Sequence, residues 1–257
     1  MRKKILIYKD DGCSNLDNLY INVNKHYADK GIEVGFTDAS EIIKENALNS
    51  EVLAFFMPGG ASTPYRKKLE HYGDDKIRSF INDGGVYFGI CAGAYYACNK
   101  TEFEMDIANM AIETTNPLNL IDAKAIGTLH KEYNIKPYSK SAASATVSRV
   151  KWNDDNEEHF TLYHGGPRFD VKDKNIQVLA TYNDISGDYP AIIRKPYGKG
   201  SIVAVGVHFE DSGAQLQKAA VIAQESQQEA QMNAQKLFDN EPSRAALFNK
   251  LMNCIGK

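Results

Sequence analysis

The chain has 257 residues, of which 43% are hydrophobic and 25% are charged, and its formal net charge is −3. This size and composition are typical of one large globular domain, or of one domain with an appendage. The weak negative charge argues against nucleic acid as a partner, and no apolar run approaches the ~18 residues that a membrane span requires.

The first hundred residues alternate between short apolar runs and helix-like stretches. We predict buried strands at 3–8, 32–37, 52–57 and 86–90. Between them we predict a helix capped by Ser14, a short helix over 40–46 and a longer one over 74–82. This alternation predicts a parallel sheet with helices on both faces.

The regular alternation weakens after residue 100. Further strands are predicted near 119–128, 144–152, 158–164, 175–182, 190–195 and 201–210, one long helix over 213–239, and a last helix opened by Pro242. We therefore expect an α/β domain over 1–212 with a β-rich insertion, and a helical extension over 213–257 packed on the same domain.

The cysteines and histidines show no spacing typical of disulfide-rich proteins or metal sites. Cys13, Cys98 and Cys254 are predicted to be a loop residue, a packing residue on the helix after Cys91, and a helix core residue. The apolar stretch 5–8 is shorter than the ~7–15 residues of a secretory signal. We predict a cytoplasmic protein with no metal and no cofactor.

Cys91 stands where a buried strand meets a helix, in the stretch Gly89-Ile90-Cys91-Ala92-Gly93. A nucleophile on such a turn is exposed at the carboxyl end of the sheet, and flanking glycines let neighbouring backbone pass close by. The helix that begins at Ala92 directs free N–H groups at the sulfur, which favours thiolate. The alternative is an inert buried thiol.

A thiol nucleophile of this kind needs a base, and the base needs an orienting group. His208 and Glu210 lie two residues apart on the last predicted core strand, so their side chains point to one side. His208 would take the thiol proton, and Glu210 would fix the imidazole tautomer. We expect the backbone N–H groups of Gly60 and Ala92 to form the oxyanion hole.

Three motifs together resemble the class I glutamine amidotransferase-like superfamily: the turn around Cys91, the glycine-rich strand end Pro58-Gly59-Gly60, and His208-Phe209-Glu210. More narrowly, "MPGGASTPY", "GICAGAYYAC", "YHGGPRF" and "VGVHFE" look like the amidotransferase-like domain at the amino end of biotin–protein ligases. This resemblance spans roughly residues 3–212. It implies a flavodoxin-like sheet and a Cys-His-Glu triad.

Two departures from the resembled families bear on function. Glutamine-hydrolysing members usually carry Gln where this chain has Tyr95, which argues against glutamine as the substrate. No Gly-Arg-Gly-Arg stretch for holding biotinyl-adenylate is present, so we expect no ligase activity. Substrate-binding candidates are Gly59, Tyr65, Tyr95, His164, Gly165 and Gly166, with Arg168 beside them; His164 to Gly166 also fit a plain surface turn.

The sequence supports two functional hypotheses. The first is a cysteine-dependent C–N hydrolase or amidotransferase acting on a small-molecule or peptide amide. The second is a non-catalytic binding or regulatory module that keeps the site without turnover and acts through a protein partner. In that case, the exposed face of the 213–239 helix would be its docking surface.

Overall fold

The computed structural model describes residues 3–222 and 226–255 of the chain. The main sheet has nine strands in the order β2 (Glu33–Thr37), β1 (Lys4–Tyr8), β3 (Val52–Met57), β4 (Val86–Ile90), β13 (Gly200–Val205), β12 (Pro190–Tyr197), β11 (Gln177–Tyr182), β8 (Thr146–Trp152), β9 (Glu158–Tyr163). The first five strands are parallel, and the other four extend the sheet antiparallel. The parallel half has the strand order of flavodoxin-like folds, which confirms the predicted α/β architecture.

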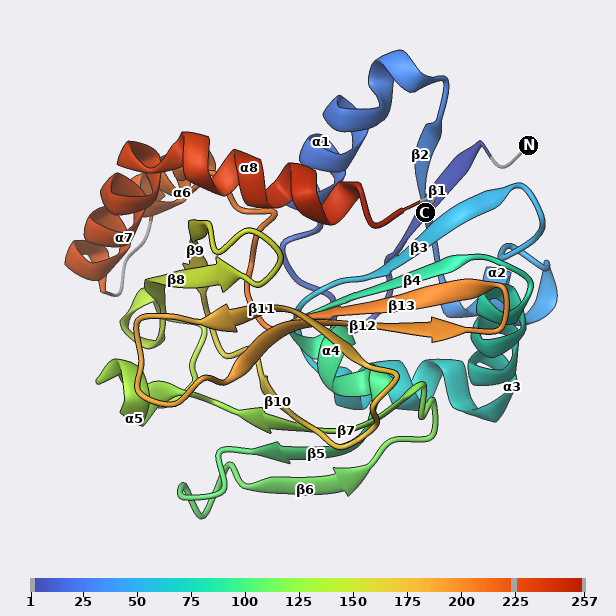
Figure 1. Ribbon diagram of the computed structural model, residues 1–257, viewed down its shortest axis with the longest axis horizontal. Coiled ribbons are helices and arrows are strands. Elements are labelled where there is room, and N and C mark those ends of the chain that lie inside the picture. Colours follow the sequence, from blue (N-terminus) through green and yellow to red (C-terminus); the bar gives the residue numbers. More distant parts are fainter. Residues whose placement is uncertain (1–2, 223–225, 256–257) are drawn as a thin grey trace.

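A second sheet packs below the main one in the view of Figure 1. Its four strands follow the order β10 (Arg168–Val171), β7 (Ile121–Gly127), β5 (Cys98–Phe103), β6 (Ile112–Thr115). Of these strands, only β7 was predicted. The other three are short, and β5 and β6 alternate polar with apolar residues too weakly to stand out in the sequence.

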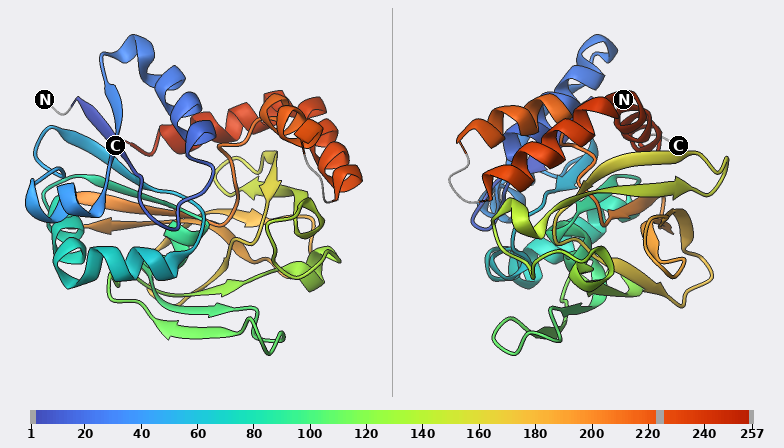
Figure 2. Two further views of the ribbon diagram at one scale, coloured as in Figure 1. Left: turned by 180° about the vertical axis from the view of Figure 1, so that it is seen from behind. Right: turned by 90° about the vertical axis from the view of Figure 1, so that its left-hand side faces the viewer.

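The helices cover both faces of the main sheet. They are α1 (Leu16–Tyr27), α2 (Ala39–Lys44), α3 (Ser62–Asn82), α4 (Ala92–Ala97), α5 (His130–Tyr133), α6 (Gly213–Ile222), α7 (Gln227–Asp239) and α8 (Glu241–Met252), with 3₁₀ turns η1 (Ala28–Lys30) and η2 (Ala142–Ser144). Figures 1 and 2 show α1 and α8 on one face, with α3 and the second sheet on the other. No helix among the described residues has the length and apolar character needed to cross a bilayer.

Each face of the parallel strands has its own core. On one face, Ile5 and Phe88 pack with Leu19 of α1 and Leu251 of α8. On the other face, the cluster of Tyr8, Phe55 and Tyr87 includes residues of α3 and α4 and of the second sheet. The alternation of side chains along each strand sends neighbouring apolar residues into the two cores. Because α8 belongs to the first core, the C-terminal helices pack on the sheet domain.

Several local predictions were wrong. Helix α1 begins after Asn15, which has left-handed backbone angles (φ 58°), and no Ser14 side chain caps it. Helix α3 begins at Ser62 rather than near 74, with a non-helical residue at Glu70. Cys98 is the first residue of β5, because α4 ends at Ala97.

The predicted single helix over 213–239 is two helices, α6 and α7, and residues 223–225 lie outside the described part of the chain. A straight helix of that length would extend about 40 Å. The two helices instead pack against each other and bury Ala220 and Ala234. The predicted last helix, opened by Pro242, is confirmed as α8.

Candidate functional site

Cys91 occupies the sharp turn between β4 and α4. Its backbone angles are φ 47° and ψ −104°, a conformation that non-glycine residues rarely adopt. The Cys91 N–H donates to the Val205 carbonyl of β13 at 2.9 Å, and the Cys91 carbonyl accepts from Tyr95 N–H at 3.0 Å. The side chain is buried but lines a pocket. The surrounding sheet therefore holds a strained turn with a thiol at its tip.

The glycines beside Cys91 are explained by close backbone approach. A Cβ at Gly93 would lie 2.1 Å from the Met57 carbonyl oxygen, and one at Gly89 would lie 2.6 Å from the Gly93 oxygen. Any side chain at either position would push β3, β4 and α4 apart.

His208 and Glu210 lie beyond the end of β13, which stops at Val205, so the prediction that a strand carries them was wrong. The His208 N–H donates to the Leu162 carbonyl at 2.8 Å, which ties this segment to β9. The imidazole Nδ1 lies 2.7 Å from Glu210 Oε1, and both side chains are buried. The carboxylate thus holds the proton on Nδ1 and leaves Nε2 to face the cysteine side of the site.

Electrostatics favour the charged form of His208. Burial lowers the pKa of His208, but the Glu210 carboxylate and the neighbouring Cys91 sulfur raise it more, so that its pKa lies well above the ordinary value. An imidazolium that keeps its proton near neutral pH is the group that stabilises a cysteine thiolate.

The carbonyl oxygen of His164 meets both Cys91 and His208. It lies 3.7 Å from Cys91 Sγ and 3.3 Å from His208 Nε2. Gly59 lies on another side of the same pair, since a Cβ there would be 2.9 Å from His208 Cε1 and 3.6 Å from Cys91 Cβ. The structure therefore brings Cys91, His208 and Glu210 together between two loops that the sequence singled out.

Gly60 and Ala92 border the pocket beside Cys91. Gly60 has φ 132°, and a Cβ there would lie 1.9 Å from the Gly12 carbonyl oxygen. Ala92 is the first residue of α4, where backbone N–H groups have no acceptor within the helix. Both residues therefore lie in the wall of the pocket that contains the thiol.

The pocket at Cys91 has a volume of about 140 Å³. Its lining residues are Gly60, Ala61, Ser62, Thr63, Cys91, Ala92, Tyr95, Thr101, Phe103, Ile112, Tyr138 and Gly165. The Tyr95 hydroxyl donates to the Gly165 carbonyl at 3.2 Å. Tyr138, in an irregular segment, carried no signal in the sequence. Tyr65 does not line this pocket: it is fully buried and donates to the Gly59 carbonyl at 2.9 Å, behind the glycine turn.

The residues of the segment His164-Gly165-Gly166 have different surroundings. Gly165 lines the pocket, whereas Gly166 packs against Gly206, whose oxygen would lie 1.9 Å from a Cβ at Gly166. The Arg168 guanidinium stacks on the Tyr189 ring at 4.2 Å, so the structure does not place it at the substrate pocket as the sequence suggested.

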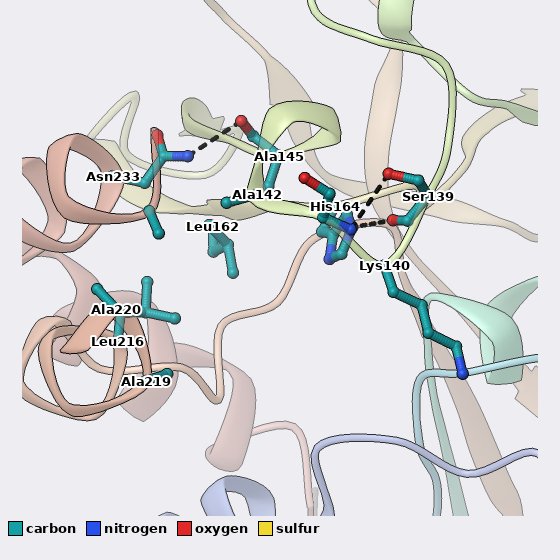
Figure 3. Close-up of a pocket in the computed structure, with 12 residues that line it drawn as sticks. Ser139, Lys140, Ala142, Ala145, Leu162, His164, Leu216, Ala219, Ala220 and Asn233 are labelled. Carbon is teal, nitrogen blue, oxygen red and sulfur yellow. Dashed lines mark hydrogen bonds between the residues drawn. The ribbon is translucent and has the colours of Figure 1, made fainter. Parts of the chain in front are cut away.

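His164 also lines a second cavity of about 470 Å³ (Figure 3). Its Nε2 lies 2.8 Å from the Ser139 carbonyl oxygen and donates to it. Burial, together with the positive charge of His208, lowers the pKa of His164 to about 4, so its ring is neutral at neutral pH. Leu216 and Ala219 of α6 form the opposite wall, and Cys91 is not among the described residues that line this cavity.

A network of partly buried hydrogen bonds holds Glu210 and Asp211, the two residues that follow Phe209, against the start of the chain. Asp211 Oδ1 accepts hydrogen bonds from the Asn15 and Asn18 side chains at 2.5 and 2.6 Å, and the Glu210 carbonyl accepts from Asn22 at 2.6 Å. Burial and the adjacent Glu210 raise the pKa of Asp211 to about 6. The sequence analysis missed this network because the asparagines, just before α1 and within it, lie nearly 200 residues away.

Two clusters among the described residues have donor atoms close enough for a metal: His208, Glu210 and Asp211 at the site itself, and Glu104, Asp106 and His130 elsewhere. The two nitrogens of His130 face different carboxylates, with Nδ1 3.1 Å from Glu104 and Nε2 3.3 Å from Asp106. Lys131 also pairs with Asp106 at 2.7 Å. Since both ring nitrogens already face carboxylates and Lys131 pairs with Asp106, the Glu104–Asp106–His130 cluster fits a network of side chains bonded to each other better than a metal site.

Comparison with known sequences assigns the family. The sequence model described as "Biotin-protein ligase, N terminal" matches residues 3–256, nearly the whole chain. The chain belongs to this biotin-protein ligase N-terminal family. The match includes all of α6, α7 and α8, so the family extends beyond the region up to 212 on which the sequence resemblance rested.

Two curated relatives differ in length. An uncharacterized protein of Chlamydia muridarum is 26% identical over 215 residues, which cover 81% of this chain and 80% of the relative. The biotin–protein ligase of Schizosaccharomyces pombe is also 26% identical, over 216 residues. The alignment covers 81% of this chain but only 33% of that ligase.

Solved structures show that the fold is amidotransferase-like. A glutamine amidotransferase from Thermotoga maritima superimposes with a TM-score of 0.62 at 12% identity, covering both chains completely. A second glutamine amidotransferase gives a TM-score of 0.53 at 18% identity, covering 83% of this chain and 95% of the other. The predicted resemblance to amidotransferase-like domains of biotin–protein ligases is therefore confirmed at the level of family and fold.

Proposed function

We propose that the protein is a cysteine-dependent amidase or acyl transferase. The observation that carries this proposal is the strained backbone of Cys91 beside a buried His208–Glu210 pair whose Nδ1–Oε1 distance is 2.7 Å. Strained residues of this kind cluster at active sites, and a nucleophile, a base and an orienting carboxylate are the three groups that acyl transfer requires.

In the proposed reaction, His208 holds the thiol proton as an imidazolium, and the Cys91 Sγ thiolate attacks the carbonyl carbon of an amide. The N–H groups of Gly60 and Ala92 stabilise the oxyanion of the tetrahedral intermediate. His208 then donates the proton to the leaving amine, and a thioester remains on Cys91. Water, activated by His208, hydrolyses the thioester to the acid, or an amine takes the acyl group instead.

The binding-module hypothesis has one supporting observation, the exposed apolar side chains on the outer helices. Val221 of α6 is 77% exposed and Met232 of α7 is 63% exposed. The position of Cys91 in a pocket wall, with the imidazole next to it, favours the enzyme. We therefore keep the binding module as the second candidate.

The proposal is tested by trapping the acyl-enzyme. Incubation with p-nitrophenyl acetate should release p-nitrophenol in a burst and leave one acetyl group, located on Cys91 by peptide mass spectrometry. The Cys91→Ala protein should show neither. Acetylation spread over surface lysines, at the same rate in both proteins, would contradict the proposal and favour the binding module.

A further inference from the structure

The side chains around the Cys91 pocket differ from those that would bind a free amino acid. Apart from the proposed thiolate of Cys91, none of the twelve described residues that line it has an ionisable acidic or basic side chain that is charged at neutral pH. An α-amino carboxylate placed there would lose water around both ionised groups, and no carboxylate side chain among the lining residues would pair with its ammonium group. Burying an unpaired ion costs several kcal/mol.

The polar groups near the pocket are largely engaged with each other. The Thr101 hydroxyl donates to the Tyr95 carbonyl at 3.3 Å and accepts from Asn116 Nδ2 at 2.9 Å. Arg66, the cation beside the lining residue Thr63, donates to the Thr63 and Thr114 hydroxyls at 3.2 and 2.8 Å. These bonds leave few groups to recognise a charged ligand.

The inner wall is aromatic. The Tyr95 and Phe103 rings meet edge to face with centroids 5.8 Å apart, and Phe103 meets Tyr138 in the same way at 5.6 Å. Ile112 completes this side at the mouth. A volume of about 140 Å³ is close to the ~150 Å³ of an engineered apolar cavity that binds benzene. Edge-to-face walls of this kind suit an aromatic ring.

From these observations we infer that the pocket selects an uncharged acyl group whose side group is apolar or aromatic and about as large as a benzene ring. The reacting carbonyl would lie at Cys91, and the side group would lie against Phe103, Ile112 and Tyr138. This assignment of the reacting end rests on the proposed function. Glutamine, with its ammonium and carboxylate groups, would be excluded.

The test is calorimetric binding of phenylacetamide and of glutamine to the full chain carrying Cys91→Ser, which slows turnover during the titration. We expect phenylacetamide to bind at least about tenfold tighter than glutamine. Ile112→Asp should weaken phenylacetamide binding by about tenfold, because it puts a carboxylate against the ring. Met105→Asp is the matched control and should change it less than about twofold.

Ile112 is 40% exposed and Met105 is 48% exposed, so both variants should fold. Glutamine binding as tight as phenylacetamide, no saturable phenylacetamide binding, or equal weakening by both variants would overturn the inference. Binding does not require an active thiol. If the protein binds phenylacetamide but Cys91 is never acylated, only the proposed function is contradicted. If Cys91 is acylated but phenylacetamide does not bind, only the inference about the acyl group is contradicted.

Discussion

His208 Nδ1 lies 2.7 Å from Glu210 Oε1, although both residues follow the end of β13 and neither belongs to a strand. Their approach depends on the backbone bond from His208 N–H to the Leu162 carbonyl, and on Asn15 and Asn22, at the start of α1 and within it, which bond to Asp211 and Glu210. The proposed base is thus positioned by three separate parts of the chain.

The charge on Glu210 should control the protonation of His208. Glu210→Gln keeps the shape of the side chain but removes the carboxylate that raises the pKa of His208, whereas the burial that lowers it remains. We therefore expect the pKa of His208 to fall in the variant. NMR titration of the imidazole signals measures this, with the His208 signal identified by its absence in His208→Ala. Glu157→Gln, at an exposed glutamate, is the control, and an unshifted His208 in Glu210→Gln would show that the pair is not coupled.

Asp211 should make the folded state less stable as the pH rises. Its folded pKa of about 6 lies above the model-peptide value of 3.8. The folded protein therefore binds this proton more tightly than the unfolded chain, and the stabilisation is complete below pH 4 and lost as the pH rises through 6. The loss is on the order of 3 kcal/mol.

Asp211→Asn should abolish this part of the pH dependence, since Asn Oδ1 can still accept from Asn15 and Asn18. Urea unfolding at several pH values between 4 and 7.5 measures the free energy of unfolding of both proteins. The variant should gain stability relative to the wild type as the pH rises through this range. A constant difference between the two proteins would show that Asp211 does not titrate there.

Gly60 and Gly31 both have positive φ but differ in surroundings, which makes them a matched pair. A Cβ at Gly31 (φ 64°) meets nothing within 4 Å, whereas one at Gly60 meets the Gly12 carbonyl oxygen at 1.9 Å. We expect Gly31→Ala to cost about 1 kcal/mol, and Gly60→Ala to cost more than about 3 kcal/mol in order of magnitude. Thermal or urea unfolding compares them. Similar losses for both would mean that the Gly60 turn can move aside.

The strands and the Cys91 turn could be predicted because their causes are local. Continuous apolar runs such as 52–57 identify buried parallel strands, and Gly89 and Gly93 mark close backbone contacts. The ends of helices were harder to predict. Asn15 precedes α1 in a left-handed conformation, and its side chain donates a hydrogen bond to Asp211 instead of capping the helix.

The parts of the site that escaped prediction depend on long-range contacts. Tyr138 lies in a segment with no regular pattern, and it reaches the pocket because Glu104 accepts a hydrogen bond from its backbone N–H at 2.7 Å. Tyr65 is an aromatic residue close in sequence to the pocket residues, which is why it was predicted to bind substrate. Its hydroxyl instead donates to the Gly59 carbonyl, and the ring lies behind the glycine turn. Such partners are set by the assembled fold and leave no periodic signal.

The central claim, that His208 activates Cys91, is tested most directly by the rate of Cys91 alkylation by iodoacetamide at several pH values, followed by peptide mass spectrometry. Cys13 is an internal control, because burial raises the pKa of its thiol and should keep it slow below neutral pH. We predict that Cys91 in the wild type reacts readily at pH 6 and that His208→Ala slows it at least about tenfold. Equal rates in the wild type and His208→Ala across the pH range would contradict the account.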